Sequence, residues 1–464
     1  MIRAGLFGLA AIALAGCRGY SRAAIDARYV EVLNYTGRDD TASARMPSQP
    51  VWEAVEQRKT LTLADAFRIT LAQSERIARA AEGFVQALTL EDRAIAAVLP
   101  TFGVQATAFF QDPVRLKSTS SFFTVANDHQ EVRFTVTQPI FHGLQLFAGG
   151  RLSQDTIDQS QAFFETERRL VFQIVAQTFY NTLFLERQLK ILEDAVKNSR
   201  ERLREMQARQ AQGIARKTEV LLIETQVASD EAQLARGRQV LDVSRTQMTF
   251  LLGRASTVPL LDDLTEPEVP ADPAPLILEA RTGRSDLRDR EAALKIAEEN
   301  LVLVSSEHLP FVDLSANWYP YRRNFSDFSE EVGWDALFTV TLNLFKGGDI
   351  RAREVAAESQ IRVARLNRDE LVRQIEADVT GALLTWRSDQ DLIKTLATRE
   401  RTSEENYRQV VTEYRQGIAG VSNLEVLVAQ NQYLAAQLEL ERQKIQSKLD
   451  WFLLENARGR IPVR

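Results

Sequence analysis

The chain has 464 residues, of which 45% are hydrophobic and 26% charged, so it is long enough for two or three ordinary folded domains. Its 57 basic and 63 acidic residues give a formal net charge of −6. This balance gives no support for a nucleic-acid partner, which would favour a clustered basic face. No apolar run of about 20 residues follows the N-terminal segment, so no transmembrane helix is predicted.

The N-terminus has the pattern of a targeting segment. Arg3 supplies a positive charge, residues 4–13 a short apolar run, and residues 14–17 (LAGC) a cleavage site with small residues. Cys17 is the only cysteine, so no intramolecular disulfide can form. The LAGC motif resembles the lipobox of bacterial lipoproteins, and Arg18 in place of an aspartate favours the outer membrane by the same resemblance. An ordinary signal peptide with an incidental thiol is the alternative.

A helix is predicted next, over about 62–98. Thr62 with Asp65 has the spacing of a capping pair at its start. A second helix of the same kind is predicted over about 275–308, and each of the two runs up to a pair of strands.

Four segments alternate between apolar and polar residues with period two, which predicts strands. They are 102–111, 131–137, 311–318 and 337–344. The alternation alone fits either a half-buried sheet in a soluble domain or strands that cross a membrane. The polar connections between paired strands and the aromatic residues near strand ends favour the membrane.

Four strands cannot close a membrane barrel, because the smallest barrels have about eight. An open sheet edge in hydrocarbon would leave backbone groups without hydrogen-bond partners. If the strands cross a membrane, several chains must therefore share one barrel. The strand count requires an oligomer without fixing its copy number.

Two very long helices are predicted, over about 147–212 and 349–416, because no proline interrupts either run. Partner helices are predicted over 218–252 and 422–457. Apolar residues at seven-residue spacing in the partner helices predict coiled-coil packing of antiparallel neighbours. They are Val220, Val227, Leu234, Leu241 and Met248 in one, and Leu438, Ile445 and Phe452 in the other. Gly213 and Gly417 lie in the connecting turns, where a positive φ is expected.

The strand-and-helix unit occurs twice. Phe134, Gly143 and Gly213 each have the same residue type 204 positions later, at Phe338, Gly347 and Gly417. Such a repeat means that one architecture is used twice. The segment 255–275 between the copies is rich in proline, which predicts a linker or an irregular collar.

No catalytic constellation is visible, so an enzyme is not expected. The histidines His129, His142 and His308 are far apart and lack a metal-ligand spacing. Neither a metal nor another cofactor is therefore expected. The glycine pairs at 149–150 and 347–348 lack the Lys-Ser/Thr of a phosphate loop, so we expect them to bend the chain from strand into helix.

In their order, several motifs resemble the TolC-like outer membrane efflux protein family, in its lipoprotein branch. They are LTLADAFRITLAQ (61–73), Leu-Pro at 99–100 and 309–310, QPIFHG (138–143), NLFKGG (343–348) and the run from Tyr414 to Leu440. The match covers roughly 60–460.

The resemblance implies a mainly α fold with a small β part, built from duplicated, long antiparallel helical hairpins plus four membrane β-strands. Three chains would form a 12-stranded β-barrel in the outer membrane and a periplasmic α-barrel. The implied partners are two sibling chains, outer-membrane lipid, a periplasmic adaptor and an inner-membrane pump. The expected divisions are a signal peptide (1–16), a lipid-anchored segment (17–60), a first repeat (61–254), the linker (255–275) and a second repeat (276–464).

The hairpin tips are where we expect the mechanism. The family often carries two acidic residues three apart just beyond the tip glycine, but here Val428 follows Glu425 at that spacing. Glu425 and Glu219 are the candidate periplasmic gate, and solvated helix-surface carboxylates are the alternative. The candidate adaptor-docking residues are Gly213, Ile214, Arg216, Lys217, Gly417 and Ile418.

The sequence therefore predicts a lipid-anchored outer-membrane channel that exports small molecules or drugs. A structural coiled-coil lipoprotein without a pore is the alternative class. Within the channel class, a duct for protein secretion is not separable from small-molecule efflux.

Overall fold

The computed structural model describes residues 49–110, 129–266, 269–324, 330–416 and 421–463. The chain divides into two compact units, each assembled from separate stretches of sequence. The sheet unit contains 82–162 and 288–369, and the helical unit contains the described part of 30–81 together with 163–287 and 370–464.

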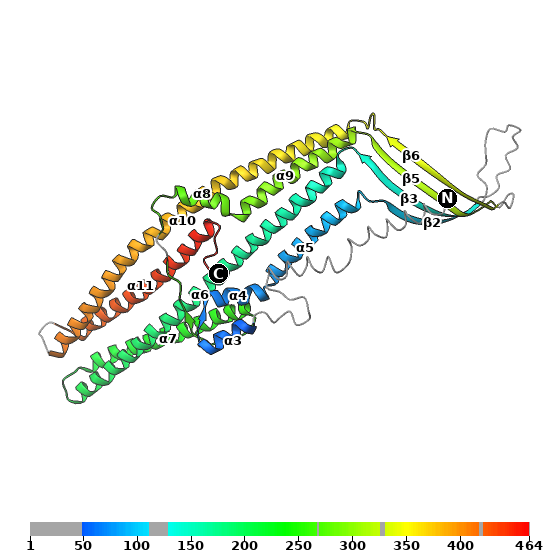
Figure 1. Ribbon diagram of the computed structural model, residues 1–464. Helices are drawn as coiled ribbons and strands as arrows, with labels where there is room; N and C mark the ends of the chain where they lie inside the picture. Colours follow the sequence, from blue (N-terminus) through cyan, green and yellow to red (C-terminus); the bar gives the residue numbers. More distant parts are fainter. Residues whose placement is uncertain (1–48, 111–128, 267–268, 325–329, 417–420, 464) are drawn as a thin grey trace. The chain divides into compact units, whose positions relative to one another are not determined.

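The sheet unit contains four antiparallel strands, which lie side by side in Figure 1. They are β2 (Thr101–Phe109), β3 (His129–His142), β5 (Phe311–Asn324) and β6 (Glu330–Thr341). Their order is β2-β3-β5-β6, so the two predicted strand pairs join along β3 and β5. The sequence placed the last strand at 337–344, but β6 ends at Thr341. Its partner β5 begins at Phe311, which pairs with Thr341, so residues 342–344 have no partner on β5.

The strand-to-helix junctions of the sheet unit use glycines with positive φ. Gly143 (φ +58°) follows β3, while Gly347 (φ +62°) and Gly348 (φ +86°) follow β6. The expectation for 347–348 is confirmed. The expectation for the glycine pair at 149–150 is wrong, because both residues lie inside a helix that already begins at Gln145. Gly143 alone makes that turn.

Four long helices follow the sequence closely. They are α6 (Gln145–Ala211), α7 (Lys217–Leu252), α10 (Asp349–Gln416) and α11 (Asn423–Ala457). Within the helical unit, α7 is antiparallel to α6, and α11 to α10 (Figure 1). Every predicted heptad residue of α7 is buried, as are Ile445 and Phe452 of α11, whereas Leu438 is only half-buried.

The shorter helices depart from the sequence in one respect. The predicted helix over 62–98 is two helices, α4 (Leu63–Gln73) and α5 (Glu75–Ala96). The predicted helix over 275–308 is also divided, into α8 (Ala274–Gly283), α9 (Ser285–Ser305) and a short 3₁₀ helix, η2 (Ser306–His308). Each break has one residue with an extended backbone, at Ser74 (ψ 117°) and Arg284 (ψ 121°). Helix propensity does not reveal the break at Ser74, whereas Gly283, a residue of low helix propensity, directly precedes the break at Arg284.

The start of α4 is as predicted. Thr62 and Asp65 form a capping box, in which each side chain pairs with the other residue's backbone N–H. Just before it, β1 (Leu61–Thr62) pairs in parallel with β4 (Leu260–Leu261), so part of the proline-rich segment is ordered. A helix α3 (Gln49–Arg58) precedes β1.

The core of the helical unit is aromatic. Phe172 on α6 packs edge-on against Phe67 of α4 and Phe452 of α11, with ring centroids 5.2 and 5.6 Å apart. Tyr180, which lies eight residues after Phe172 on α6, is fully buried, and its ring centroid is 5.4 Å from that of Phe452. Through the described ranges, no helix carries an apolar stretch long enough to cross a bilayer.

Candidate functional site

The four-stranded sheet has one continuous apolar face. The pairings β2–β3, β3–β5 and β5–β6 place apolar residues opposite one another in adjacent strands. The residues of this face are Phe102, Val104, Phe134, Val136, Leu314, Ala316, Trp318, Trp334, Phe338 and Val340. Most of their large side chains are exposed within the chain, as at Val104 (67%) and Trp334 (74%). The described residues leave this apolar surface uncovered.

The opposite face of the sheet carries a polar ladder across the strands. Thr135 of β3 donates a hydrogen bond to Asn317 of β5 over 2.8 Å, and Asn317 donates to Asp335 of β6 over 2.8 Å. Arg133 of β3 donates to Gln105 of β2 on the same face. An apolar face and a polar face are the pattern of a sheet that separates lipid from water.

The turn after α6 ends the helix in a Schellman motif. Gly213 has φ +78°, the N–H of Gly213 donates to the Gln210 carbonyl, and the N–H of Ile214 donates to the Arg209 carbonyl. The predicted positive φ at Gly213 is thus confirmed. Ile214 projects at the tip with 70% of its surface exposed. Arg216 and Lys217 follow, also exposed, where α7 begins. Gly417 and Ile418 lie outside the described residues.

The two candidate gate acids occupy equivalent positions in the first turns of their helices. The Glu219 carboxylate accepts a hydrogen bond from the Arg216 backbone N–H (2.9 Å), and the Glu425 carboxylate accepts one from the Ser422 backbone N–H (2.8 Å). Both acids therefore cap a helix, which lowers the cost of its unpaired N–H groups. Glu425 is exposed and Glu219 half-buried.

Behind the tips, a buried polar network joins three helices. Ser199 of α6 donates to Asp230 of α7 and accepts from Gln430 of α11 over 3.1 Å. Gln226 also donates to Asp230, over 2.7 Å. The sequence analysis did not predict these contacts, because polar residues at such positions are typical of the solvent-exposed surface of a coiled coil. Only the buried polar partners reveal that they form a specific contact.

Arg202 extends this network toward the tip of α11. Its guanidinium donates to Asn423 (2.8 Å) and to Gln430 (3.3 Å), both through amide oxygens. Burial lowers the pKa of Arg202, and nearby acidic groups, Glu205 among them, offset the cost of desolvating its charge only in part. The α6–α11 contact near the tip thus combines the Ser199–Gln430 hydrogen bond with the hydrogen bonds of this half-buried cation.

The third contact near the tips joins α10 to α6. The Tyr414 hydroxyl lies 3.8 Å from the Met206 sulfur, and the Arg209 guanidinium lies 5.4 Å from the Tyr414 ring centroid. Arg415 is 3.7 Å from Glu205. Contacts from α7, α10 and α11 thus converge on the last turns of α6.

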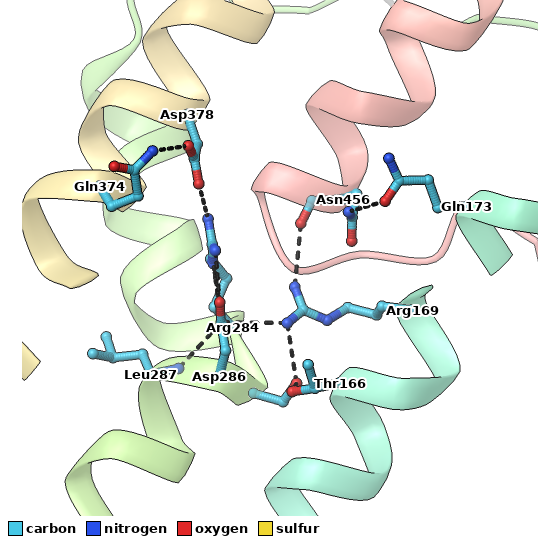
Figure 2. Close-up of polar contacts among 10 residues, drawn as sticks. Thr166, Arg169, Gln173, Arg284, Asp286, Leu287, Gln374, Asp378 and Asn456 are labelled. Atoms are coloured by element: carbon cyan, nitrogen blue, oxygen red, sulfur yellow. Dashed lines mark hydrogen bonds and ion pairs between the residues drawn. The ribbon is translucent and has the colours of Figure 1, made fainter. Parts of the chain in front are cut away.

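A second polar cluster lies where α9 begins, and Figure 2 shows it. Arg284 lies between Asp286 (2.6 Å) and Asp378 of α10 (2.9 Å), while Arg169 of α6 donates to the Asn456 carbonyl of α11 (3.2 Å). Burial alone would raise the pKa of Asp286, but the hydrogen bond and charge of Arg284 outweigh it and hold that pKa below its usual value. The cluster lines a pocket of about 450 Å³.

Two histidines form separate carboxylate pairs in the sheet unit. His142 lies 2.8 Å from Asp313, and His308 lies 3.2 Å from Glu354. In the described portion, no group of three or more His, Cys, Asp or Glu side chains is placed to hold a metal ion.

The family model described as "Outer membrane efflux protein" matches residues 68–254 and 276–460 of this chain. The chain is also similar to the pyoverdine export outer membrane protein OpmQ of Pseudomonas putida, with 24% identity over 326 residues that cover 68% of each protein.

Two solved structures share the fold. The outer membrane protein VceC of Vibrio cholerae matches with a TM-score of 0.73 at 18% identity, over 86% of this chain and 96% of VceC. The CmeC outer membrane channel of Campylobacter jejuni matches with a TM-score of 0.75 at 14% identity, over 92% of this chain and 91% of CmeC.

Proposed function

The chain belongs to the outer membrane efflux protein family, and on this premise we propose that it is the outer-membrane duct of a tripartite export system. Small molecules or drugs would pass through it from a periplasmic adaptor and an inner-membrane pump to the exterior. The observation that carries the proposal is the sheet, in which an uncovered apolar face lies opposite a polar ladder.

The edges of the sheet support assembly with sibling chains. In the described strands, β2 and β6 each pair on one side only. An unpaired backbone group in hydrocarbon costs several kcal/mol, so each edge needs another strand. Three copies of this sheet would supply 12 strands, with the apolar face toward lipid and the polar face toward a shared lumen. The long helices of the three chains would continue the lumen through the periplasm.

The adaptor would bind at the hairpin tips. Ile214 offers an exposed apolar side chain there, and Arg216 and Lys217 offer two positive charges beside it. The second tip would contribute Gly417 and Ile418. A membrane-fusion protein with apolar and acidic contacts fits such a surface.

Glu425 and Glu219 would form the charged constriction at the periplasmic end. In a symmetric trimer, each acid would occur three times around the axis, which favours the passage of cations. Their capping hydrogen bonds support this role by fixing each carboxylate at a helix end beside the tip.

The lipid anchor would be Cys17, which lies outside the described residues. Diacylglycerol and an N-acyl chain together would give stable membrane anchoring, since one chain alone binds only marginally. The lipoprotein signal favours small molecules over proteins as cargo, and the name of OpmQ, a pyoverdine export protein, supports the same class.

The test is channel formation by the purified full-length protein. We expect an oligomer about three times the chain mass that dissociates on heating, and single-channel conductance in planar bilayers. A stable oligomer without conductance would favour the pore-free structural lipoprotein. Export of a protein substrate by cells, with no small-molecule efflux, would favour the secretion duct.

A further inference from the structure

Asp389 of α10 and Asp450 of α11 are two buried carboxyl groups that lie close enough for a hydrogen bond when one of them carries a proton. Only 9% and 7% of their surfaces are exposed. Each also accepts one amide hydrogen bond, Asp389 from Gln443 (2.8 Å) and Asp450 from Gln446 (3.0 Å). The second oxygen of Asp389, Oδ2, is buried and has no donor in the described part of the chain.

A hydrogen bond between two carboxyl groups needs a proton, because two ionised carboxylates only repel each other. Burial raises the pKa of Asp389, and the neighbouring Asp450 raises it further, to about 6. Gln443 favours the ionised form and offsets these effects only in part. The buried oxygen without a donor is therefore explained if a proton lies between the two residues.

The charged groups around the pair are already matched to other partners. From α6, Arg169 pairs with Asp286, and at the start of α9, Arg284 pairs with Asp286 and with Asp378 of α10. From α11, Lys448 donates to the Leu264 carbonyl and lies 3.8 and 3.9 Å from Asp262 and Glu266. Among the described residues, no cation is therefore dedicated to the pair.

We propose that Asp389 retains a proton, donates it in a hydrogen bond to Asp450 and so forms a pH-sensitive bridge between α10 and α11. In acid, the O–H of one carboxyl group donates to the other and holds the helices together. As the pH rises, the proton passes to water, leaving two carboxylates and a hydronium ion, and the repulsion loosens the contact. Asp450 also lines the pocket of about 450 Å³, which is large enough to admit the accepting water.

The bridge does not depend on the proposed channel function, since it concerns a contact within one chain. It links the packing of α10 and α11 to the pH of the surroundings. A long helix pair of this kind can change its packing when one buried contact is lost.

The first test is infrared spectroscopy of the full-length protein in detergent. Between about pH 5 and pH 7.5, we expect the wild type to lose the band of a protonated carboxyl C=O, with a midpoint near 6. Asp389→Asn and Asp450→Asn should each lack this titrating band. The exposed Asp391→Asn is the control, because Asp391 lies on the same helix and pairs with Lys394.

Hydrogen exchange tests whether the contact between α10 and α11 loosens as the pH rises. After correction for intrinsic rates, amides near positions 389 and 450 of the wild type should exchange about tenfold faster at the higher pH. In Asp389→Asn, the new amide N–H can donate to Asp450 at any pH, so the difference should vanish. A wild type without a titrating carboxyl band, or a band that persists in both variants, would overturn the proposal.

Discussion

The backbone N–H of Ser422 donates a hydrogen bond to the side chain of Glu425 across 2.8 Å, so the candidate gate residue also caps α11. Charge and capping can be separated by two substitutions. Glutamine retains the oxygen that accepts the hydrogen bond, whereas removal of the Ser422 hydroxyl weakens the cap and leaves the charge in place.

For Glu425→Gln, we expect reduced cation selectivity in planar bilayers with almost unchanged thermal stability. For Ser422→Ala, we expect the reverse, with the wild-type selectivity and a loss of about 1 kcal/mol in the free energy of unfolding. Unchanged ion selectivity and blocker sensitivity in Glu425→Gln would limit this glutamate to its capping role.

A new positive charge should reduce membrane assembly when it is placed on the apolar face of the sheet, but not when it is placed on the polar face. Phe338→Arg places the charge on the apolar face, where a lipid-facing arginine costs up to about 2–4 kcal/mol, depending on its depth in the bilayer. We expect much less assembled protein in the outer-membrane fraction. Thr339→Arg is the matched control, since the next residue on β6 points to the polar face and pairs with Asp313. Equal membrane levels of the two variants would argue against lipid on the apolar face.

Gly213 and Gly149 make a second matched pair, because an added Cβ meets nothing within 4 Å at either position. At Gly213 (φ +78°), alanine must adopt a left-handed conformation, so Gly213→Ala should cost about 1 kcal/mol. Gly149 lies inside α6, where alanine should stabilise by up to about 1 kcal/mol. Denaturant unfolding checks both, and destabilisation by Gly149→Ala would contradict the helical assignment.

The Arg284 cluster predicts sensitivity to strong acid. The pKa of Asp286 is lower in the folded chain than in the unfolded chain, so the unfolded state takes up its proton first as the pH falls. The stabilisation by this residue is therefore complete above about pH 4 and is lost as the pH falls through the folded pKa. Stability measured against pH should show this loss in the wild type, and Asp286→Asn should reduce it. An unchanged acid profile in the variant would contradict the prediction.

Much of this architecture could be predicted from the sequence because its signals are local. Alternation identified all four strands, although β6 begins seven residues before its predicted start. Uninterrupted helix-favouring runs placed α6 and α10 within two residues of their ends. The cap at Thr62 and the positive φ at Gly213 followed from residue type and position alone.

The sequence by itself determined the repeated strand-and-helix plan and the shortage of strands, since period, turn chemistry and strand count are properties of the chain. Only the tertiary structure decided which polar residues face one another. Ser199 meets Asp230 between α6 and α7, and Asp389 meets Asp450 between α10 and α11. The break at Ser74 was also not predicted, since serine does not disrupt a helix by itself. Such contacts depend on which residue of the neighbouring helix faces each polar side chain, and no local sequence pattern specifies that residue.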